Sequence, residues 1–211
     1  MTRLLRVVAG LGVIGLLAAG CSTASEAGDQ ASPETSSASR SATAGDDEAG
    51  MLPHSGAPAV SEPLPISALP PDPCQTFTRA QVEEALGEDA PEGKRDDIET
   101  GPWCSWQDPD TGATISASFL VTTKQGLSGL YRNAKPIAKV WQEIPSVGGF
   151  PAVAFQLAEN EVSCSVHIGL ADEYSLGVTV APARESRGDA CAFSQRLAEI
   201  AVANLREGAR S

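Results

Sequence analysis

Apolar and polar residues alternate in a series of short runs between Trp103 and Ala181, which is the pattern of strands that bury one face. In one run, Val153, Phe155 and Leu157 would share the buried face. Short turn sequences such as DPDTG and ADE join neighbouring runs, so we predict a mainly antiparallel sheet of about five or six strands. The expected strands are residues 103–107, 113–122, 139–144, 152–157, 162–170 and 174–181.

Helical patterns flank and interrupt this strand-rich region. Thr78 followed by Gln81 is a capping-box sequence, and Gly87 would end the helix that it begins. A second helix is expected from Asp189 to Arg206, and a shorter one over residues 124–135. We therefore predict an α+β domain with an N-terminal and a C-terminal helix on one face of the sheet.

The N-terminus has the layout of a secretory signal. Arg3 and Arg6 precede an uncharged apolar run, and small residues then lead to Cys21. The run is shorter than the ~20 residues that a membrane span requires. This ending resembles the lipobox of bacterial lipoproteins, which implies a signal peptide at residues 1–20 and a diacylglycerol thioether on Cys21. The lipid would hold the protein on the outer face of the cell membrane; the alternative is an ordinary signal peptide and an unmodified cysteine.

The segment that follows contains mainly Ser, Ala, Thr, Gly, Pro and acidic residues. It has no aromatic residue and few branched apolar ones, so it cannot bury enough apolar surface to fold. We expect residues 21–71 to form a lipidated, disordered tether in which His54 is solvated. Regular apolar periodicity begins at Asp72, and one globular domain is expected at residues 72–207.

Four of the five cysteines lie in the expected domain. An even number of cysteines in an exported domain indicates disulfides, and four cysteines allow three pairings. We favour Cys74–Cys104 and Cys164–Cys191, because each pair closes a loop of about thirty residues between neighbouring elements. A metal site is disfavoured because the sequence has no Cys-x-x-Cys pair, and we expect neither a metal nor another cofactor.

The charge and the motif inventory exclude several function classes. A formal net charge of -12 argues against nucleic acid as a partner and against adhesion to anionic lipid by charge. Phosphate-binding loops, dinucleotide fingerprints and metalloprotease pairs do not occur in the sequence. Acidic residues cluster over 88–101 and could attract calcium, but their spacing does not match an EF-hand loop, so we expect a solvated loop.

The outward face of the strand at 162–170 would carry Ser163, Ser165 and His167, which we take as candidate ligand-binding residues. Ser and His on one face could indicate nucleophilic catalysis, but no nucleophile elbow accompanies them. A face of small side chains could instead receive a ligand or a partner protein, or could be one more packing face. The small outward residues that we expect are Ser116, Ser118, Ala152, Ala154, Ser163, Ser165, Ser175 and Thr179.

Three motifs resemble one known family. The domain start DPCQTFTRAQVEEALG, the CSW at Cys104–Trp106 and the later SVGGFPAVAF are similar to the actinobacterial lipoprotein family called domain of unknown function 3558 (DUF3558). The resemblance covers residues 72–205 and implies a location and a fold, but no chemistry. In the CSW strand, Cys104 and Trp106 would face the core, and Trp103 the opposite side.

A non-enzymatic surface lipoprotein that binds an unknown envelope ligand or protein partner is the function that these features favour. Two alternatives stay open. One is an envelope hydrolase that uses Ser165 or His167, and the other is a structural subunit of a cell-envelope complex.

Overall fold

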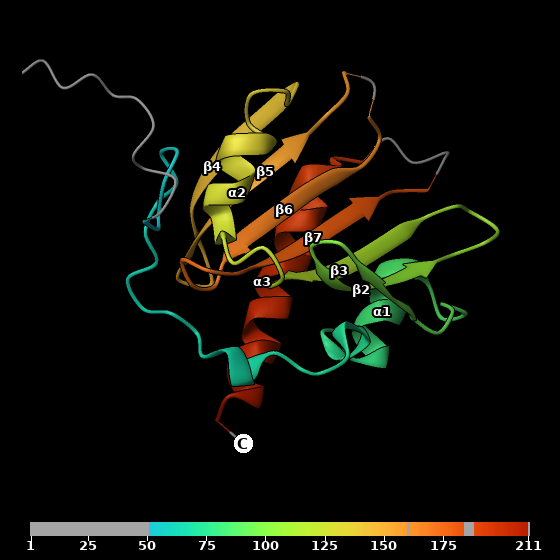
Figure 1. Ribbon diagram of the computed structural model, residues 1–211. Helices are drawn as coiled ribbons and strands as arrows, with labels where there is room; N and C mark the ends of the chain where they lie inside the picture. The colour runs from blue at the N-terminus through green and yellow to red at the C-terminus, as the bar shows by residue number, and fades with distance from the viewer. Residues whose placement is uncertain (1–50, 160, 184–187, 211) are drawn as a thin grey trace, which may run out of the picture. The chain divides into compact units, whose positions relative to one another are not determined.

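Seven antiparallel strands form one sheet in the part of the chain that the computed structural model describes, residues 51–159, 161–183 and 188–210. They follow the order β1-β2-β3-β7-β6-β5-β4 (Figure 1). Each pair of neighbours is antiparallel, as the hairpin sequences predict. The strands are β1 (Lys94–Ile98), β2 (Gly101–Gln107), β3 (Thr114–Leu120), β4 (Val140–Val147), β5 (Phe150–Gln156), β6 (Cys164–Gly169) and β7 (Ser175–Ala181).

Helices cover both faces of this sheet. The long helix α3 (Ala190–Gly208) and the short α1 (Arg79–Leu86) lie on one face, and α2 (Gly126–Asn133) lies on the other (Figure 1). Two short 3-10 turns, η2 (Ile66–Ala68) and η3 (Pro73–Gln75), precede α1. The predicted α+β class is confirmed, and the expected short helix over 124–135 is α2.

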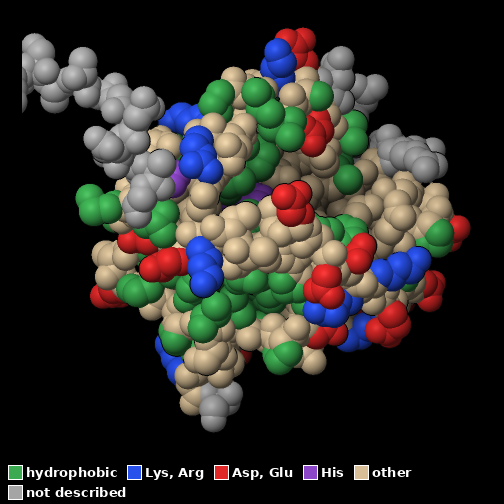
Figure 2. All heavy atoms as spheres, in the orientation of Figure 1, with side chains coloured by type: hydrophobic (Ala, Val, Ile, Leu, Met, Phe, Trp, Pro, Cys, Tyr) green, Lys and Arg blue, Asp and Glu red, His purple; other side chains and the backbone are tan. Residues whose placement is uncertain are grey.

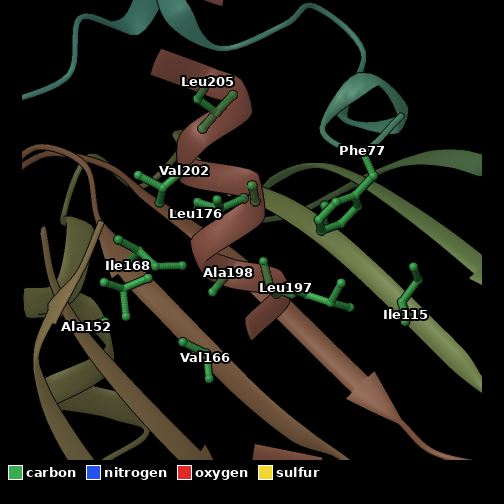
Figure 3. Packing of buried hydrophobic residues seen from close by; sticks show 14 of the residues in the cluster. Phe77, Ile115, Ala152, Val166, Ile168, Leu176, Leu197, Ala198, Val202 and Leu205 are labelled. Atoms are coloured by element: carbon green, nitrogen blue, oxygen red, sulfur yellow. The ribbon is translucent and has the colours of Figure 1, made fainter. Parts of the chain in front are cut away.

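The main core fills the space between α3 and the sheet. Leu197, Ala198 and Val202 of α3 point toward the strands, where Val166 and Ile168 of β6 meet them (Figure 3). Ala198 is fully buried, so the helix axis can approach the sheet closely. This core removes from water the buried stripe of α3 and the inner faces of six strands, β2 to β7.

Strand β5 is turned over relative to its expected orientation. Ala152 and Ala154 face α3 and belong to the main core, whereas Val153 and Phe155 pack against α2 in a second, smaller core. Leu157 lies past the end of the strand and is 46% exposed. The larger side chains were expected to face the main core, but that face needs small residues beneath α3 and α2 provides another apolar layer.

Both terminal helices begin at the predicted caps. The Thr78 hydroxyl accepts a hydrogen bond from the Gln81 amide at 3.3 Å, and the Gln81 side chain accepts one from the Thr78 amide at 2.8 Å. Gly87 ends α1 with φ +107°, a backbone region that favours glycine. The Asp189 carboxylate accepts from two amides of the first turn of α3. These caps satisfy amide groups that a helix N-terminus leaves unpaired.

The two predicted disulfides, Cys74–Cys104 and Cys164–Cys191, are present. The first joins η3 to β2, and the second joins β6 to the first turn of α3. In the CSW strand, Cys104 and Trp106 face the core as expected, and the Trp106 ring meets Phe77 edge to face at 5.7 Å. Each disulfide therefore ties a helical element to the sheet.

Strand β1 is the strand that was not predicted, since residues 88–101 were expected to form a loop. All five of its residues are exposed, and it pairs only with β2 at the edge of the sheet. An edge strand with solvent on both faces does not need alternating apolar and polar residues, and charged side chains are typical of such strands. The sequence KRDDI therefore carries no periodic signal.

Residues 51–71, here called the N-terminal strap, pack against the domain, so the prediction of a disordered tether up to Pro71 is wrong for this part. The amide of Val60 donates to the Asp172 carboxylate at 2.9 Å, and that of Leu64 donates to the Leu170 carbonyl at 2.9 Å. The Tyr174 hydroxyl donates to the Leu64 carbonyl. The ordered domain thus begins before Asp72.

His54 is buried rather than solvated, with 5% of its surface exposed. Its amide donates to the Ser128 hydroxyl of α2 at 2.9 Å. The strap inserts single apolar residues, among them Leu64 and Ala68, into the main core at long spacings. Such isolated residues produce no period that a strand or helix pattern would detect.

The expected signal peptide, Cys21 and residues 22–50 of the expected tether lie outside the described residues. Among the residues that are described, no helix is both long and apolar enough to cross a membrane.

Candidate functional site

Two rows of side chains cross the face of the sheet that is opposite α3. Strand pairing fixes both rows, because each residue lies beside the next one on the neighbouring strand. The first row is Ser105, Ser116, Thr179, Ser165 and Phe155, and the second is Trp103, Ser118, Gly177, His167 and Val153. We call the part formed by Ser105, Ser116, Ser118, Ser165, His167, Gly177 and Thr179 the hydroxyl face.

The hydroxyl face carries no charged side chain. On β2, β3, β6 and β7, none of the residues on this side of the sheet is Lys, Arg, Asp or Glu. Figure 2 looks onto this side and shows a largely tan surface, hollowed beside a purple histidine, with an acidic side chain at the hollow's edge. Ser105, Ser118, Ser165 and Thr179 are partly exposed. This surface therefore offers hydroxyl groups and backbone to solvent, without charge.

Aromatic rings border the hydroxyl face on the α2 side. Tyr131 of α2 meets Trp141 of β4 at 5.1 Å, Trp141 stacks on Phe155 of β5 at 5.8 Å, and Phe155 meets the His167 ring at 5.4 Å between centroids. The far border is Trp103 on β2, which is partly exposed; beyond it the edge strand β1 places Asp96 beside Trp103 and Lys94 beside Ser105. Four strand spacings separate β2 from β5, so the two borders lie about 19 Å apart.

His167 lies in the floor of this face and is 8% exposed. Its ring covers Gly177 on β7, where a Cβ atom would stand 2.6 Å from the ring Cε1 and 2.9 Å from Nε2. Its Nδ1 is buried without a hydrogen-bond partner. Burial lowers the pKa of His167 to about 4, because the apolar surroundings disfavour the charged imidazolium. The imidazole is therefore neutral at neutral pH.

A family model described as protein of unknown function (DUF3558) matches residues 16–204. The chain belongs to the DUF3558 family. No curated protein and no solved structure matches it. The match includes the N-terminal strap as well as the sheet and helices of this DUF3558 protein.

The three predicted ligand-binding residues do not all meet in the DUF3558 domain. Ser165 and His167 share the hydroxyl face, but Ser163 lies before β6, where its hydroxyl donates to the Glu161 carboxylate at 2.8 Å. The Ser165 hydroxyl is 2.8 Å from that of Thr179. The Ser165 hydroxyl, which shares the hydroxyl face with His167, thus pairs with the Thr179 hydroxyl rather than with the imidazole.

Most of the small residues expected on the outward face do lie there. Ser116, Ser118, Ser175 and Thr179 belong to it, whereas Ala152 and Ala154 belong to the main core. Sequence reasoning missed two members of the face, Ser105 and Gly177. Ser105 stands two residues from Trp103 and could have been placed beside it by strand alternation.

A separate cavity of about 400 Å³ lies on the α3 side, between the ends of α1, β3, β7 and the start of α3. Each charged residue that lines the cavity already interacts with a neighbouring group. Asp189 caps α3, and the Arg196 guanidinium lies 5.2 Å from the Phe193 ring. Asp108 accepts hydrogen bonds from Thr111 and Asp110, which hold the pKa of its carboxyl below the usual value. The remaining lining is mostly apolar, including Leu86, Ile115 and Val180.

Metal ligands do not gather in the described part of the chain. There, no group of three or more His, Cys, Asp or Glu side chains is arranged to hold a metal ion. In the acidic run, Arg95 forms an ion pair with Asp97 at 2.8 Å within β1, and both side chains are solvent-exposed.

Proposed function

We propose that this DUF3558 protein is a lipid-anchored, extracytoplasmic binding protein that takes its ligand on the hydroxyl face. The N-terminal signal and the lipobox-like ending at Cys21 support the anchor. The disulfides Cys74–Cys104 and Cys164–Cys191 are compatible with an oxidising compartment outside the cytoplasm.

One observation carries the binding role, namely the uncharged small residues on four adjacent strands. An antiparallel sheet face that meets only water is usually covered with polar side chains, and long charged ones keep it soluble. Here the corresponding positions hold Ser, Thr and Gly, so a ligand could approach the backbone closely. This arrangement is costly for solubility alone and suits a surface that another molecule covers.

The hydrolase alternative is less well supported by the geometry. A serine nucleophile needs a base within hydrogen-bond reach, but the Ser165 hydroxyl is paired with Thr179. A second requirement is an oriented imidazole, yet Nδ1 of His167 is buried without a partner. A binding role needs neither feature.

A structural subunit of an envelope complex is the second candidate, and an exposed apolar cluster favours it. Val140, Leu157 and Val162 are 40%, 46% and 71% exposed. They lie close together, since Val140 pairs with Gln156 and the Gln156 side chain donates to the backbone carbonyls of Glu161 and Ser163. Crosslinking in intact cells would show a stoichiometric partner at this cluster if the protein were such a subunit.

Metabolic labelling tests the anchor. Cells that produce the wild-type chain or its Cys21→Ala variant are grown with an alkyne-bearing fatty acid, and the purified protein is examined by fluorescence and intact mass. The proposal expects label and added lipid mass on the wild type alone. An unlabelled wild-type protein would contradict the anchor.

Retention of envelope material tests the binding face. The full-length protein is immobilised, incubated with solubilised cell envelope and washed, and the retained material is quantified. Thr179→Lys places a charge in the centre of the hydroxyl face, whereas Gln142→Lys places the same charge on the exposed edge strand β4. The proposal expects loss of retention for Thr179→Lys only. Equal retention by wild type and Thr179→Lys would contradict it.

A further inference from the structure

We infer that the ligand of the hydroxyl face is a neutral oligosaccharide, an inference that rests on the proposed binding function. Three independent features of the face select this chemistry: its uncharged hydroxyl groups, its flanking aromatic ring on β2, and its buried neutral histidine.

The hydroxyl groups match a polyhydroxy ligand in chemical kind. Each Ser or Thr hydroxyl provides one donor and two acceptor lone pairs, as sugar hydroxyls do. Ser105, Ser116 and Thr179 follow one another across three strands, so their hydroxyls form a line across the sheet. Two of the three are partly exposed. A linear glycan laid along this line could exchange hydrogen bonds with successive strands.

The absence of charge on the same strands argues against ionic ligands. Anionic polymers and phosphate groups are recognised by Arg and Lys, and none of the residues on this side of β2, β3, β6 and β7 is basic. No acidic residue lies on this side of these four strands. On the neighbouring edge strand β1, Lys94 lies beside Ser105 and Asp96 beside Trp103, so one charge of each sign flanks the face. A purely apolar ligand would cover the hydroxyls without pairing them, which is unfavourable.

Trp103 supplies the aromatic surface that sugar recognition commonly uses. The apolar C–H face of a sugar ring packs on an aromatic ring, while the indole N–H can still donate a hydrogen bond. Trp103 is partly exposed and lies beside Ser118 in the second row. About 19 Å separates its strand from that of Phe155, so the face has room for several linked rings.

His167 gives the floor a group that a hydroxyl ligand suits. Its neutral imidazole has one donor and one acceptor nitrogen. Nδ1 itself is buried without a partner, and 8% of the residue's surface is exposed in the floor of the face. The ring covers Gly177 next to the Ser118 hydroxyl, so the imidazole forms part of the floor in the second row. A hydroxyl can donate or accept and can pair with either tautomer, whereas an anion or a cation can pair with only one kind of nitrogen.

The test uses the full-length protein and an array of defined oligosaccharides. The array contains neutral linear glucans, mannans, galactans and arabinans, together with sulfated and uronic-acid oligosaccharides of the same lengths. We expect binding to at least one neutral series, at least about tenfold tighter than to its charged counterparts. Uniform absence of binding to the neutral series would overturn the inference, and so would equal binding to the sulfated series.

Variants assign the binding to this face. Trp103→Ala should weaken it about tenfold or more, and Trp103→Phe should retain most of it, since an aromatic ring remains. Thr179→Lys provides a second disruption that leaves Trp103 in place, and Gln142→Lys is the matched control that should not change the affinity. If binding were unchanged in both Trp103→Ala and Thr179→Lys, the glycan would bind elsewhere and the inference would be wrong.

The outcomes separate this inference from the function on which it rests. Envelope retention that depends on Thr179, combined with no binding to any neutral oligosaccharide, would leave the binding function standing and remove the glycan. If neither envelope retention that depends on Thr179 nor binding to a neutral oligosaccharide were found, both the binding function and the glycan inference would be wrong.

Discussion

The His167 ring lies over Gly177 on the adjacent strand, so closely that a Cβ atom on that glycine would be 2.6 Å from the ring. The same Cβ would be 2.6 Å from the Ser118 hydroxyl on the other neighbouring strand. Because real Cβ atoms do not approach other atoms so closely, the imidazole can occupy this position over the sheet only while residue 177 is glycine. The missing side chain of Gly177 therefore leaves the space that the His167 ring fills on the hydroxyl face.

Gly177→Ala should therefore destabilise the fold and displace the imidazole. Overpacking of this kind costs about 1–3 kcal/mol in the free energy of unfolding, measured by urea denaturation. Gly208→Ala is the matched control, because a Cβ there would meet nothing within 4 Å, and its change should stay within about 0.5 kcal/mol. Equal stability of the two variants would show that the ring does not rest on Gly177.

The pKa of His167 predicts a dependence of stability on pH. Burial lowers it from 6.5 to about 4, so between these values the unfolded chain binds a proton that the folded chain does not. Stability therefore falls as the pH decreases from about 6.5 to about 4, and this contribution is fully present above that window. The total loss from this group is of the order of 3 kcal/mol.

His167→Gln isolates this contribution, since glutamine does not titrate. We expect the unfolding free energy of the wild type to fall between about pH 7.5 and about pH 4.5 by some 2–3 kcal/mol more than that of the variant. Carboxyls with lowered pKa values, such as those of Glu143 and Glu161, are present in both proteins and cancel in the comparison. Parallel curves for the two proteins would show that His167 is not protected from protonation.

Sequence patterns among residues that lie close together along the chain predicted the helix cap and the disulfides. The cap at Thr78 needs only residues three positions apart, and the disulfide loops join neighbouring elements, so both were correct. Strand β1 and the strap could not be found in this way. Strand β1 pairs with β2, which follows it directly in the sequence, but all its residues are exposed and produce no alternation. The strap is held by contacts with the residues around Leu170, which lie far away in the sequence.

The hydroxyl face was only half predictable for the same reason. Alternation placed Ser165 and His167 on one side of their strand. It could not show that β3 pairs with β7, which is what brings Ser116 next to Thr179. Nor could it decide which side of β5 meets α3, because the alanines and the larger residues of that strand are both buried.

Removal of one disulfide should cost a large part of the total stability. The loop closed by Cys164–Cys191 has a sequence separation of 27, for which the chain-entropy model gives about 3.5 kcal/mol. We expect at least this loss in the free energy of unfolding for the double variant Cys164→Ala/Cys191→Ala, with an intact mass that shows the remaining disulfide. A loss below about 1 kcal/mol would mean that the bridge does not restrain the unfolded chain.

The strap offers a matched pair of residues that tests where the domain begins. Leu64 is 7% exposed and belongs to the main core, whereas Ile66, two residues later, is 59% exposed. Leu64→Ala should lower the free energy of unfolding by about 2 kcal/mol or more, because it removes buried methyl groups and leaves a space beneath the strap. Ile66→Ala should change it by no more than about 0.5 kcal/mol. If both variants were as stable as the wild type in urea denaturation, the strap would not unfold together with the sheet, and the cooperative domain would begin near Asp72.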